Sequence, residues 1–322
     1  MMAQLPTNSH LKIAHETIAA IDMAVERGAE AETRRGYLGG SVIGKPCERA
    51  LWYEFRMAHD KEKFSGRMLR LFDTGHVEEA RMIRWLRMSG ATVHDVDPSR
   101  DEQWAVEAVS GHMRGHLDGI VTGIREAPKT PHLLECKTHN AKSFAQLVKH
   151  GVAVAKPEHV AQMQVYMHLK GLTRALYLAK NKDTDELYAE RLDYDQAHAL
   201  TLIAKAERII NASSAPPRIS DDPDWFQCRF CPAWSMCHGD KFAGRNCRTC
   251  IHAHPFEGGK WACLRHDRSL SDDDQRAGCP NHLYLPSLVP GEQIDADERA
   301  ETVTYRMADG SEWVDGAERN AA

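Results

Sequence analysis

Two short segments of the chain carry residue types that could hydrolyse a phosphodiester bond with the help of a metal ion. One segment contains Asp118, and the other contains Glu135, Cys136 and Lys137. Both are expected to be strands, so Glu135 and Lys137 share one face while Cys136 points to the opposite face. If the strands are neighbours, two carboxylates and one ammonium group converge. Carboxylates are hard ligands for Mg²⁺ or Mn²⁺, and an ammonium group orients water or steadies developing charge.

An ordinary structural interpretation exists for each of these residues. Asp118 would cap a turn with Gly119, and Glu135 and Lys137 would form a solvent-facing pair on an edge strand. A triplet of glutamate, any residue and lysine is common, so taken alone it favours this interpretation. The surrounding motifs decide between the two.

The order of the motifs resembles the PD-(D/E)XK nuclease superfamily, in particular its RecB-like exonuclease branch. The carrying residues are a G-x-x-D-G-I segment, Gly115 to Ile120, followed by an apolar-E-x-K-T strand, Leu133 to Thr138. In this branch, an upstream helix has a glycine followed four residues later by an acidic residue or histidine at the metal site. Gly75 and Glu79 match that spacing; His76, on the same helix face, is a second candidate out of register. The spacing favours Glu79.

A Q-x-x-x-Y motif downstream adds to the resemblance. Gln162 and Tyr166 lie four residues apart and would present one helix face, from which an amide and a phenol contact DNA phosphate or orient the lysine. The resemblance implies a divalent metal ion, Mg²⁺ or Mn²⁺, and a lysine, Lys137, that positions water. It also implies the ligands of the ion, which are Glu79, Asp118, Glu135 and the carbonyl of Cys136.

The nine cysteines divide into two sets and one remainder. Cys228, Cys231 and Cys237 form a C-x2-C-x5-C group that lacks a fourth ligand, and Cys47 is the candidate. This arrangement resembles the iron–sulfur staple of AddB and of CRISPR-associated RecB-like exonucleases, which implies a [4Fe–4S] cluster. Zinc at the same thiols, or a Cys47 packed as a small apolar side chain, are the alternatives.

The second set, Cys247, Cys250, Cys263 and Cys279, has spacing typical of a structural Zn²⁺ site. A nearby histidine in place of one of the last two cysteines, a second iron–sulfur cluster, disulfides and free thiols remain alternatives. The remaining thiol, Cys136, is expected to be buried.

Hydrophobic periodicity predicts an α, then β, then α, then β order. The expected helices are 9–27, one starting at 46, 66–89, 141–150, 157–170 and 195–211, with a Gly/Arg-rich loop at 28–40. The expected strands are 91–96, 103–110, 113–124, 132–138, 174–180 and 187–193, with a hairpin within 303–314.

Composition narrows the class of protein. The 322 residues are 42% hydrophobic and 27% charged, which is ordinary globular usage. The net charge is −5, which excludes the basic excess of a protein that coats nucleic acid. A positively charged groove is still compatible with this net charge, because acidic residues elsewhere would balance it. No apolar run approaches the roughly 20 residues of a membrane span, and the N-terminus lacks the order of a secretory signal. A cytoplasmic protein with no membrane partner is expected.

These observations predict an α/β fold with a PD-(D/E)XK restriction-endonuclease-like core, in which helices flank a mixed central sheet. Residues 1–240 are expected to form the nuclease domain, 241–290 a zinc module and 291–322 an acidic tail. The implied function is metal-dependent DNA exonuclease activity in phage or prophage recombination or repair, with a recombination or annealing protein as a candidate partner. The alternatives are a nuclease that trims CRISPR spacers and a non-catalytic DNA-binding iron–sulfur scaffold.

Overall fold

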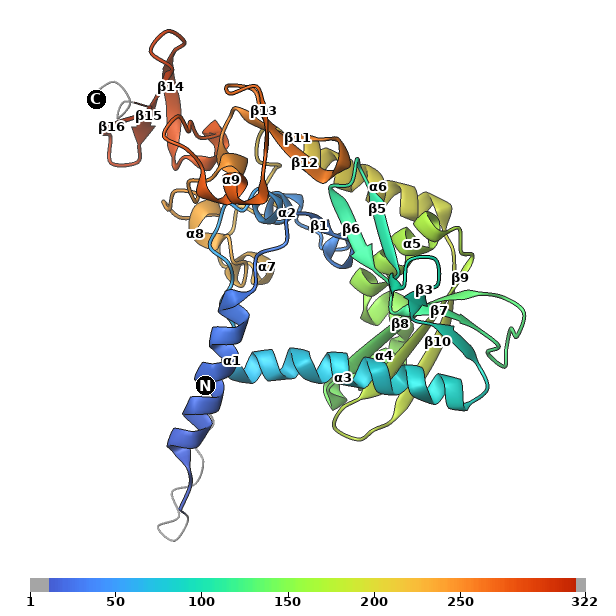
Figure 1. The fold of residues 1–322 in the computed structure, drawn as a ribbon. Coiled ribbons are helices and arrows are strands. Elements are labelled where there is room, and N and C mark those ends of the chain that lie inside the picture. Colours follow the sequence, from blue (N-terminus) through green and yellow to red (C-terminus); the bar gives the residue numbers. More distant parts are fainter. Residues whose placement is uncertain (1–11, 317–322) are drawn as a thin grey trace.

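A five-stranded mixed sheet forms the centre of the fold (Figure 1). In this computed structural model, which describes residues 12–316, the strand order is β10-β9-β8-β7-β2. Within this sheet only β8 and β9 pair in parallel, and α4 and α5 form the crossover that a parallel pair requires. The bounds are β2 Thr92–His94, β7 Gly119–Thr122, β8 His132–His139, α4 Ala141–Ala155, α5 Pro157–Lys170, β9 Arg174–Asn181 and β10 Leu187–Asp193.

Helices cover both faces of this sheet. Leu133 of β8 packs in the core on the side of α4 and α5, whereas Leu134 and Cys136 pack in a second cluster with Met82 of α3 (Gly66–Met88). Figure 1 shows α3 crossing one side of the sheet. The expected mixed α/β core with flanking helices is therefore confirmed, and so is the buried position of the Cys136 thiol.

One predicted strand was wrong. Residues 113–124 do not form a continuous strand, because the chain leaves β6 (Met113–His116) at Leu117 and enters β7 in a different sheet. Leu117 is fully buried, and its N–H donates to the carbonyl of Trp104 at 3.0 Å. This bond outside the main sheet holds the chain at the point where it changes sheets.

The second sheet is smaller and has the order β1-β6-β5. A separate two-stranded hairpin, β3-β4, precedes β5 in the sequence. It contains the last residue of the predicted strand 91–96 and the first residue of the predicted strand 103–110. The bounds are β1 Leu38–Gly39, β3 Val96–Asp97, β4 Glu102–Gln103 and β5 Ala105–Ala108.

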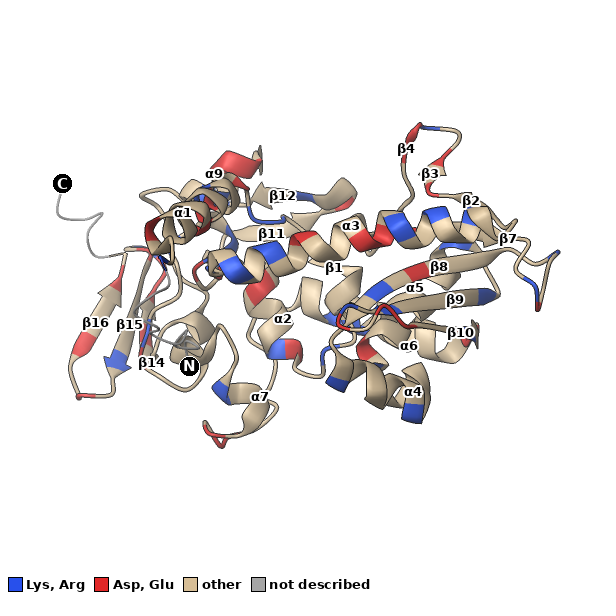
Figure 2. Ribbon diagram, turned by 90° about the horizontal axis from the view of Figure 1, so that it is seen from below, with Lys and Arg blue, Asp and Glu red and all other residues tan. Residues whose placement is uncertain are grey.

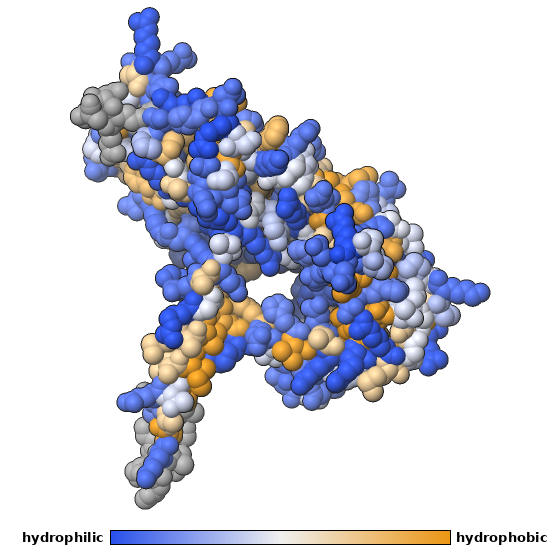
Figure 3. Space-filling view, in the orientation of Figure 1, coloured by the Kyte–Doolittle hydropathy of each residue, from blue (hydrophilic) through white to orange (hydrophobic). Residues whose placement is uncertain are grey.

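Two helices near the N-terminus border an opening through the molecule, visible in Figure 3. α1 (His15–Ala31) starts and ends later than predicted, although residues 9–11 lie outside the described part of the chain. It crosses the start of α3, where Glu26 accepts the N–H of Gly66 at 2.7 Å. Orange side chains gather at this junction in Figure 3. The exposed rings of Phe64 and Phe72 lie edge to face, 5.0 Å apart, beside and within the start of α3. No helix within residues 12–316 has the length and apolar character needed to cross a bilayer.

The C-terminal part contains more regular structure than predicted. The expected acidic tail carries a meander, β14-β15-β16, of which only the β15-β16 hairpin was predicted. A second meander, β11-β12-β13, and α9 lie in the segment with the second cysteine set; Figure 2 shows the acidic start of α9. Remaining bounds are α2 Glu48–Phe55, α6 Gln196–Asn211, α7 Phe226–Arg229, α8 Trp234–Cys237, β11 Ala253–Phe256, β12 Lys260–Cys263, β13 Arg268–Leu270, α9 Asp272–Ala277, β14 Gly291–Asp297, β15 Thr302–Met307 and β16 Glu312–Asp315.

Trp261 connects the cysteine-rich segment to the N-terminal half of the protein. Its side chain is fully buried, 5.4 Å from the ring of Phe55 and 6.0 Å from that of His112. The guanidinium of Arg248 lies 4.7 Å above its ring and donates to the carbonyl of Phe55 at 2.9 Å. The hydrophobic core is thus continuous across residue 240, while the division into three domains stays a prediction.

We expect Trp261→Ala to destabilise the whole described fold by about 3–5 kcal/mol, because a large buried aromatic side chain leaves a cavity. Denaturant unfolding followed by fluorescence and by circular dichroism should show one shifted transition. Leu264→Ala is the control in the same segment, since Leu264 is 69% exposed. Two separate transitions, of which only the smaller shifts, would contradict the shared core.

Candidate active site

The candidate site lies where β7 and β8 separate. Their register ends at the pair Gly119 and Leu134, and one residue before β7 the chain presents Asp118. Oδ2 of Asp118 accepts the backbone N–H of Cys136 at 2.7 Å, so a side chain takes the place of the strand partner. Within a strand, the N–H and C=O of one residue point to the same side. The carbonyl of Cys136 therefore faces the space beside Asp118.

Glu135 is the most buried group of the site, with no exposed surface. One carboxylate oxygen accepts a hydrogen bond from Nζ of Lys137, and the other accepts from Nε2 of Gln162 at 3.0 Å. Burial raises the pKa of Glu135 to about 7, even though the ammonium group of Lys137 acts in the opposite direction. Burial also opposes the charge on Lys137, but the carboxylates of Glu135 and Asp118 outweigh it and raise the pKa of that lysine.

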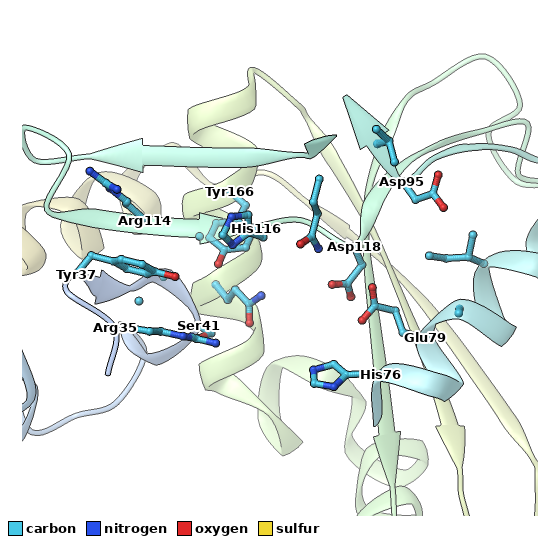
Figure 4. A pocket seen from close by; sticks show the side chains of 18 of the residues that line it. Arg35, Tyr37, Ser41, His76, Glu79, Asp95, Arg114, His116, Asp118 and Tyr166 are labelled. Atoms are coloured by element: carbon cyan, nitrogen blue, oxygen red, sulfur yellow. The ribbon is translucent and has the colours of Figure 1, made fainter. Parts of the chain in front are cut away.

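The helix α3 brings a third carboxylate to the site. Burial and the neighbouring Asp118 raise the pKa of Glu79 to about 7. In Figure 4 the carboxylates of Asp118 and Glu79 point toward one another, and His76 lies beside them. Both helical candidates therefore reach the site, and Glu79 is the one in electrostatic contact with two carboxylates.

A buried ion pair fixes α3 against the sheet. Glu78 is 6% exposed, and one of its oxygens lies 2.9 Å from Nζ of Lys180 on β9. Its other oxygen lies 2.7 Å from a guanidinium nitrogen of Arg81. Because Glu78 is held in this way, the next residue, Glu79, is directed toward the β7–β8 end.

Two glycines allow Tyr166 to reach the same space from α5. A Cβ atom on Gly115 would lie 2.1 Å from the Tyr166 hydroxyl, and one on Gly40 would lie 2.5 Å from its ring. Larger residues at either position would displace the tyrosine. Gln162 and Tyr166 thus share one face of α5, as the motif predicted, and both line the site.

Two cavities meet at this site. The first, of about 630 Å³, is lined by Asp118, Gln162 and Tyr166, and the second, of about 1550 Å³, by Lys137 and Cys136. Both cavities share three further lining residues, Arg35, His76 and Glu79. The predicted site residues therefore lie around these two adjoining cavities, except Glu135, which is fully buried behind Lys137 and Gln162.

The structure adds residues that the sequence motifs missed. Arg35, Tyr37, Asp95, Arg114 and His116 line the first cavity. Figure 4 shows Arg35, Tyr37 and Arg114 on the side opposite Glu79 and His76. For Arg35 and Tyr37, the one available sequence signal was the Gly/Arg-rich composition of residues 28–40.

The two predicted cysteine sets are each gathered in space. Burial raises the pKa of Cys228, and the nearby thiols of Cys237 and Cys47 raise it further. Burial likewise raises the pKa of Cys247 to about 11, with Cys279 and Cys250 adding to the effect. Within residues 12–316, however, no three His, Cys, Asp or Glu side chains stand closely enough to form a metal site as they lie.

No family model and no curated protein matches this chain. Among solved structures, an alkaline exonuclease (LHK-Exo) from Laribacter hongkongensis matches at 17% identity and a TM-score of 0.40, covering 58% of this chain and 90% of its own. The same exonuclease in complex with dAMP matches at 17% identity and a TM-score of 0.41, with 55% and 87% covered. A protein designated SSO0001 matches at 14% identity and a TM-score of 0.40, with 69% and 96% covered.

A histidine–tyrosine network lies beneath Lys137. The hydroxyl of Tyr177 lies 2.9 Å from His139 Nε2 and 2.9 Å from His159 Nδ1, and can donate to one ring while it accepts from the other. Burial, followed by the charge of Lys156 or Lys137, lowers the pKa of His139 to about 4 and that of His159 to about 3. Both rings are neutral near pH 7.

Each of these histidines should therefore lower the free energy of unfolding as the pH drops below about 6.5, because the unfolded chain then binds a proton that the folded ring refuses. Glu79 and Glu135, whose pKa values are raised, act in the opposite direction over the same range. The limiting slope is about 1.4 kcal/mol per pH unit for each histidine, continuing down to the folded pKa values. Urea unfolding of wild type and His159→Gln between pH 7.5 and 5 checks this. Below pH 6.5 the slopes of the two proteins should differ by up to about 1.4 kcal/mol per pH unit, the contribution of His159. An equal slope in both proteins would contradict the neutral network. His150→Gln, at an exposed position of α4, is the control.

Proposed function

We propose that this protein is a metal-dependent DNA exonuclease. The observation that carries the proposal is the convergence of Asp118, Glu135 and Lys137 at one strand end, facing Glu79 across a cavity. Buried carboxylates that raise one another's pKa are costly to maintain, and such groups concentrate at functional sites. A solvent-facing ion pair on an edge strand, the ordinary alternative, does not fit a Glu135 with no exposed surface.

The donor set suits a hard divalent cation. Carboxylate oxygens of Glu79, Asp118 and Glu135, with the carbonyl of Cys136, are the ligand type that Mg²⁺ and Mn²⁺ prefer. Burial raises the pKa of Glu79 and Glu135, and repulsion between the carboxylates adds to it; a bound cation would relieve both. When bound there, such an ion supplies Lewis-acid stabilisation of the charge that develops on a phosphodiester.

The protein's own groups position the substrate and the water. Lys137 is held by Glu135, keeps its proton, and therefore presents a fixed positive charge to an attacking water. Gln162 fixes the second oxygen of Glu135, so the carboxylate cannot rotate away. The hydroxyl of Tyr166 reaches the cavity beside them and is suited to a phosphate oxygen.

The opening bordered by α1 and α3 supports an exonuclease rather than an endonuclease (Figure 3). A DNA strand that passes through a closed opening must enter by one of its ends. Cleavage would therefore require DNA with a free end. The sequence resemblance adds a role in phage or prophage recombination or repair.

Substitutions at the site test the proposed chemistry. Asp118→Asn, Glu135→Gln and Lys137→Ala should each lower cleavage of end-labelled linear DNA with Mn²⁺ by at least about 100-fold, because each removes a ligand or a fixed charge. Glu298→Gln, at an exposed carboxylate distant in sequence, should cleave normally. Near-normal cleavage by any two folded site variants would refute the assignment.

We also propose that the two cysteine sets hold metal. Cys47, Cys228, Cys231 and Cys237 would bind a [4Fe–4S] cluster, and Cys247, Cys250, Cys263 and Cys279 a Zn²⁺ ion. Support comes from the electrostatic effect that the thiols of each set exert on one another. Cys47 lies about 180 residues before its partners in sequence, yet it acts on Cys228 and Cys231. Thiolates so placed repel one another unless a cation joins them.

Anaerobically purified protein should contain about four irons per chain, and Cys47→Ser should lose the iron and its visible absorbance. Cys136→Ala is the matched control, because that thiol belongs to neither set and packs on α3. Cys250→Ser should lose zinc while it retains iron. Full iron content in Cys47→Ser would place the fourth ligand elsewhere.

A further inference from the structure

The wall of the first cavity opposite the carboxylates carries two arginines that lack an acidic partner. Among the described residues, the side chain of Arg35 has no hydrogen-bond or ion-pair partner. Arg114 is fixed by backbone carbonyls alone: its Nε donates to Gly111 at 2.8 Å and its Nη2 to Gly258 at 3.4 Å. Neither positive charge is neutralised by a carboxylate within residues 12–316.

An aromatic ring lies between these arginines. Tyr37 is half-buried, and the guanidinium carbon of Arg114 is 5.9 Å from its ring centre. Figure 4 shows Arg114, Tyr37 and Arg35 together, with Ser41 and Tyr166 between them and Asp118. The cavity of about 630 Å³ is within the range that holds a small ligand such as a nucleotide.

From this arrangement we propose a nucleotide subsite beside the scissile bond. Arg35 and Arg114 bind phosphate groups of the strand, and Tyr37 packs against the base between them. Guanidinium groups bind phosphate oxygens with charge-assisted hydrogen bonds, and aromatic rings bind unpaired bases by stacking. This inference rests on the proposed function and specifies its substrate class, which is a single strand or a frayed end.

The charges across the cavity support this orientation of the strand. Glu79 and Asp118 line one side and would repel a phosphate, whereas Arg35 and Arg114 on the other side attract one. Asp95, on the carboxylate side, is paired with Arg87 at 2.6 Å. A base stacked on Tyr37 must leave a duplex, since a paired base has both faces covered by its neighbours. A fully paired blunt end therefore uses the two arginines but not the ring.

Binding measured without divalent metal tests the subsite independently of cleavage. The probe is a short fluorescein-labelled oligothymidylate in EDTA, followed by anisotropy over a range of salt concentrations. Each lost phosphate contact lowers the slope of log affinity against log salt by about 0.7 for a single strand. Arg35→Ala should lose about 0.7 of slope and about tenfold in affinity, and Arg35→Ala with Arg114→Ala about 1.4 of slope.

Matched variants separate charge, ring and fold. Arg35→Lys should restore most of the slope, and Arg299→Ala, at an exposed arginine in the β14–β15 turn, should change nothing. Tyr37→Phe should bind normally, whereas Tyr37→Ala should lose about tenfold on the oligothymidylate and nothing on an abasic strand of equal length.

Unchanged slope and affinity in Arg35→Ala, or absence of binding by wild type, would overturn the subsite. An equal loss on the normal and the abasic strand in Tyr37→Ala would overturn the role of the ring. Failure of the proposed function has a different signature: wild type would bind the strand as described and would not cut linear DNA after Mn²⁺ is added.

Discussion

One hydrogen bond, from the backbone N–H of Cys136 to Asp118, determines how the two halves of the candidate site meet. It forms because the chain changes sheets at Leu117, so β7 and β8 no longer pair beyond Gly119 and Leu134. A regular ladder at this point would use the N–H of Cys136 for strand pairing. The interruption instead turns the Cys136 backbone toward a carboxylate, and the space between the strands becomes a cavity.

The other elements hold side chains at this interruption. α5 supplies Gln162, which fixes Glu135, and α3 supplies Glu79, which is directed by the buried pair of Glu78 and Lys180. Lys137 gains its firmly held proton from the carboxylates around it. The charge balance is thus local: three carboxylates surround one lysine, and the net negative charge leaves room for a cation. The opposite wall carries unpaired positive charge, which suits a phosphate.

Much of this could be predicted from the sequence where periodicity is strong and ends are marked. The helix over 157–170 has Pro157 in its first turn and Gly171 in the left-handed conformation after its end, and the structure has the same bounds. The alternation in β8 correctly placed Glu135 and Lys137 on one face and Cys136 on the other. Helix period then placed Gln162 and Tyr166 together.

The rest depends on contacts between distant residues. The sequence pattern of residues 113–124 is that of one continuous strand, so it does not reveal the break at Leu117. The break depends on the hydrogen bond from the Leu117 N–H to the carbonyl of Trp104, a contact between separate segments. The continuation of α1 through Gly28 is stabilised by its packing on α3, not by local propensity. Arg35 and Arg114 lie 79 positions apart, and only the fold brings them to one cavity.

The location of a bound ion is the most direct test of the central claim. Anomalous diffraction from crystals soaked in Mn²⁺ should show a peak within about 2.0–2.3 Å of carboxylate oxygens of Asp118 and Glu135 and of the Cys136 carbonyl. The same peak should be absent from crystals of Asp118→Asn. A Mn²⁺ ion bound elsewhere, with none beside Asp118 and Glu135, would contradict the account.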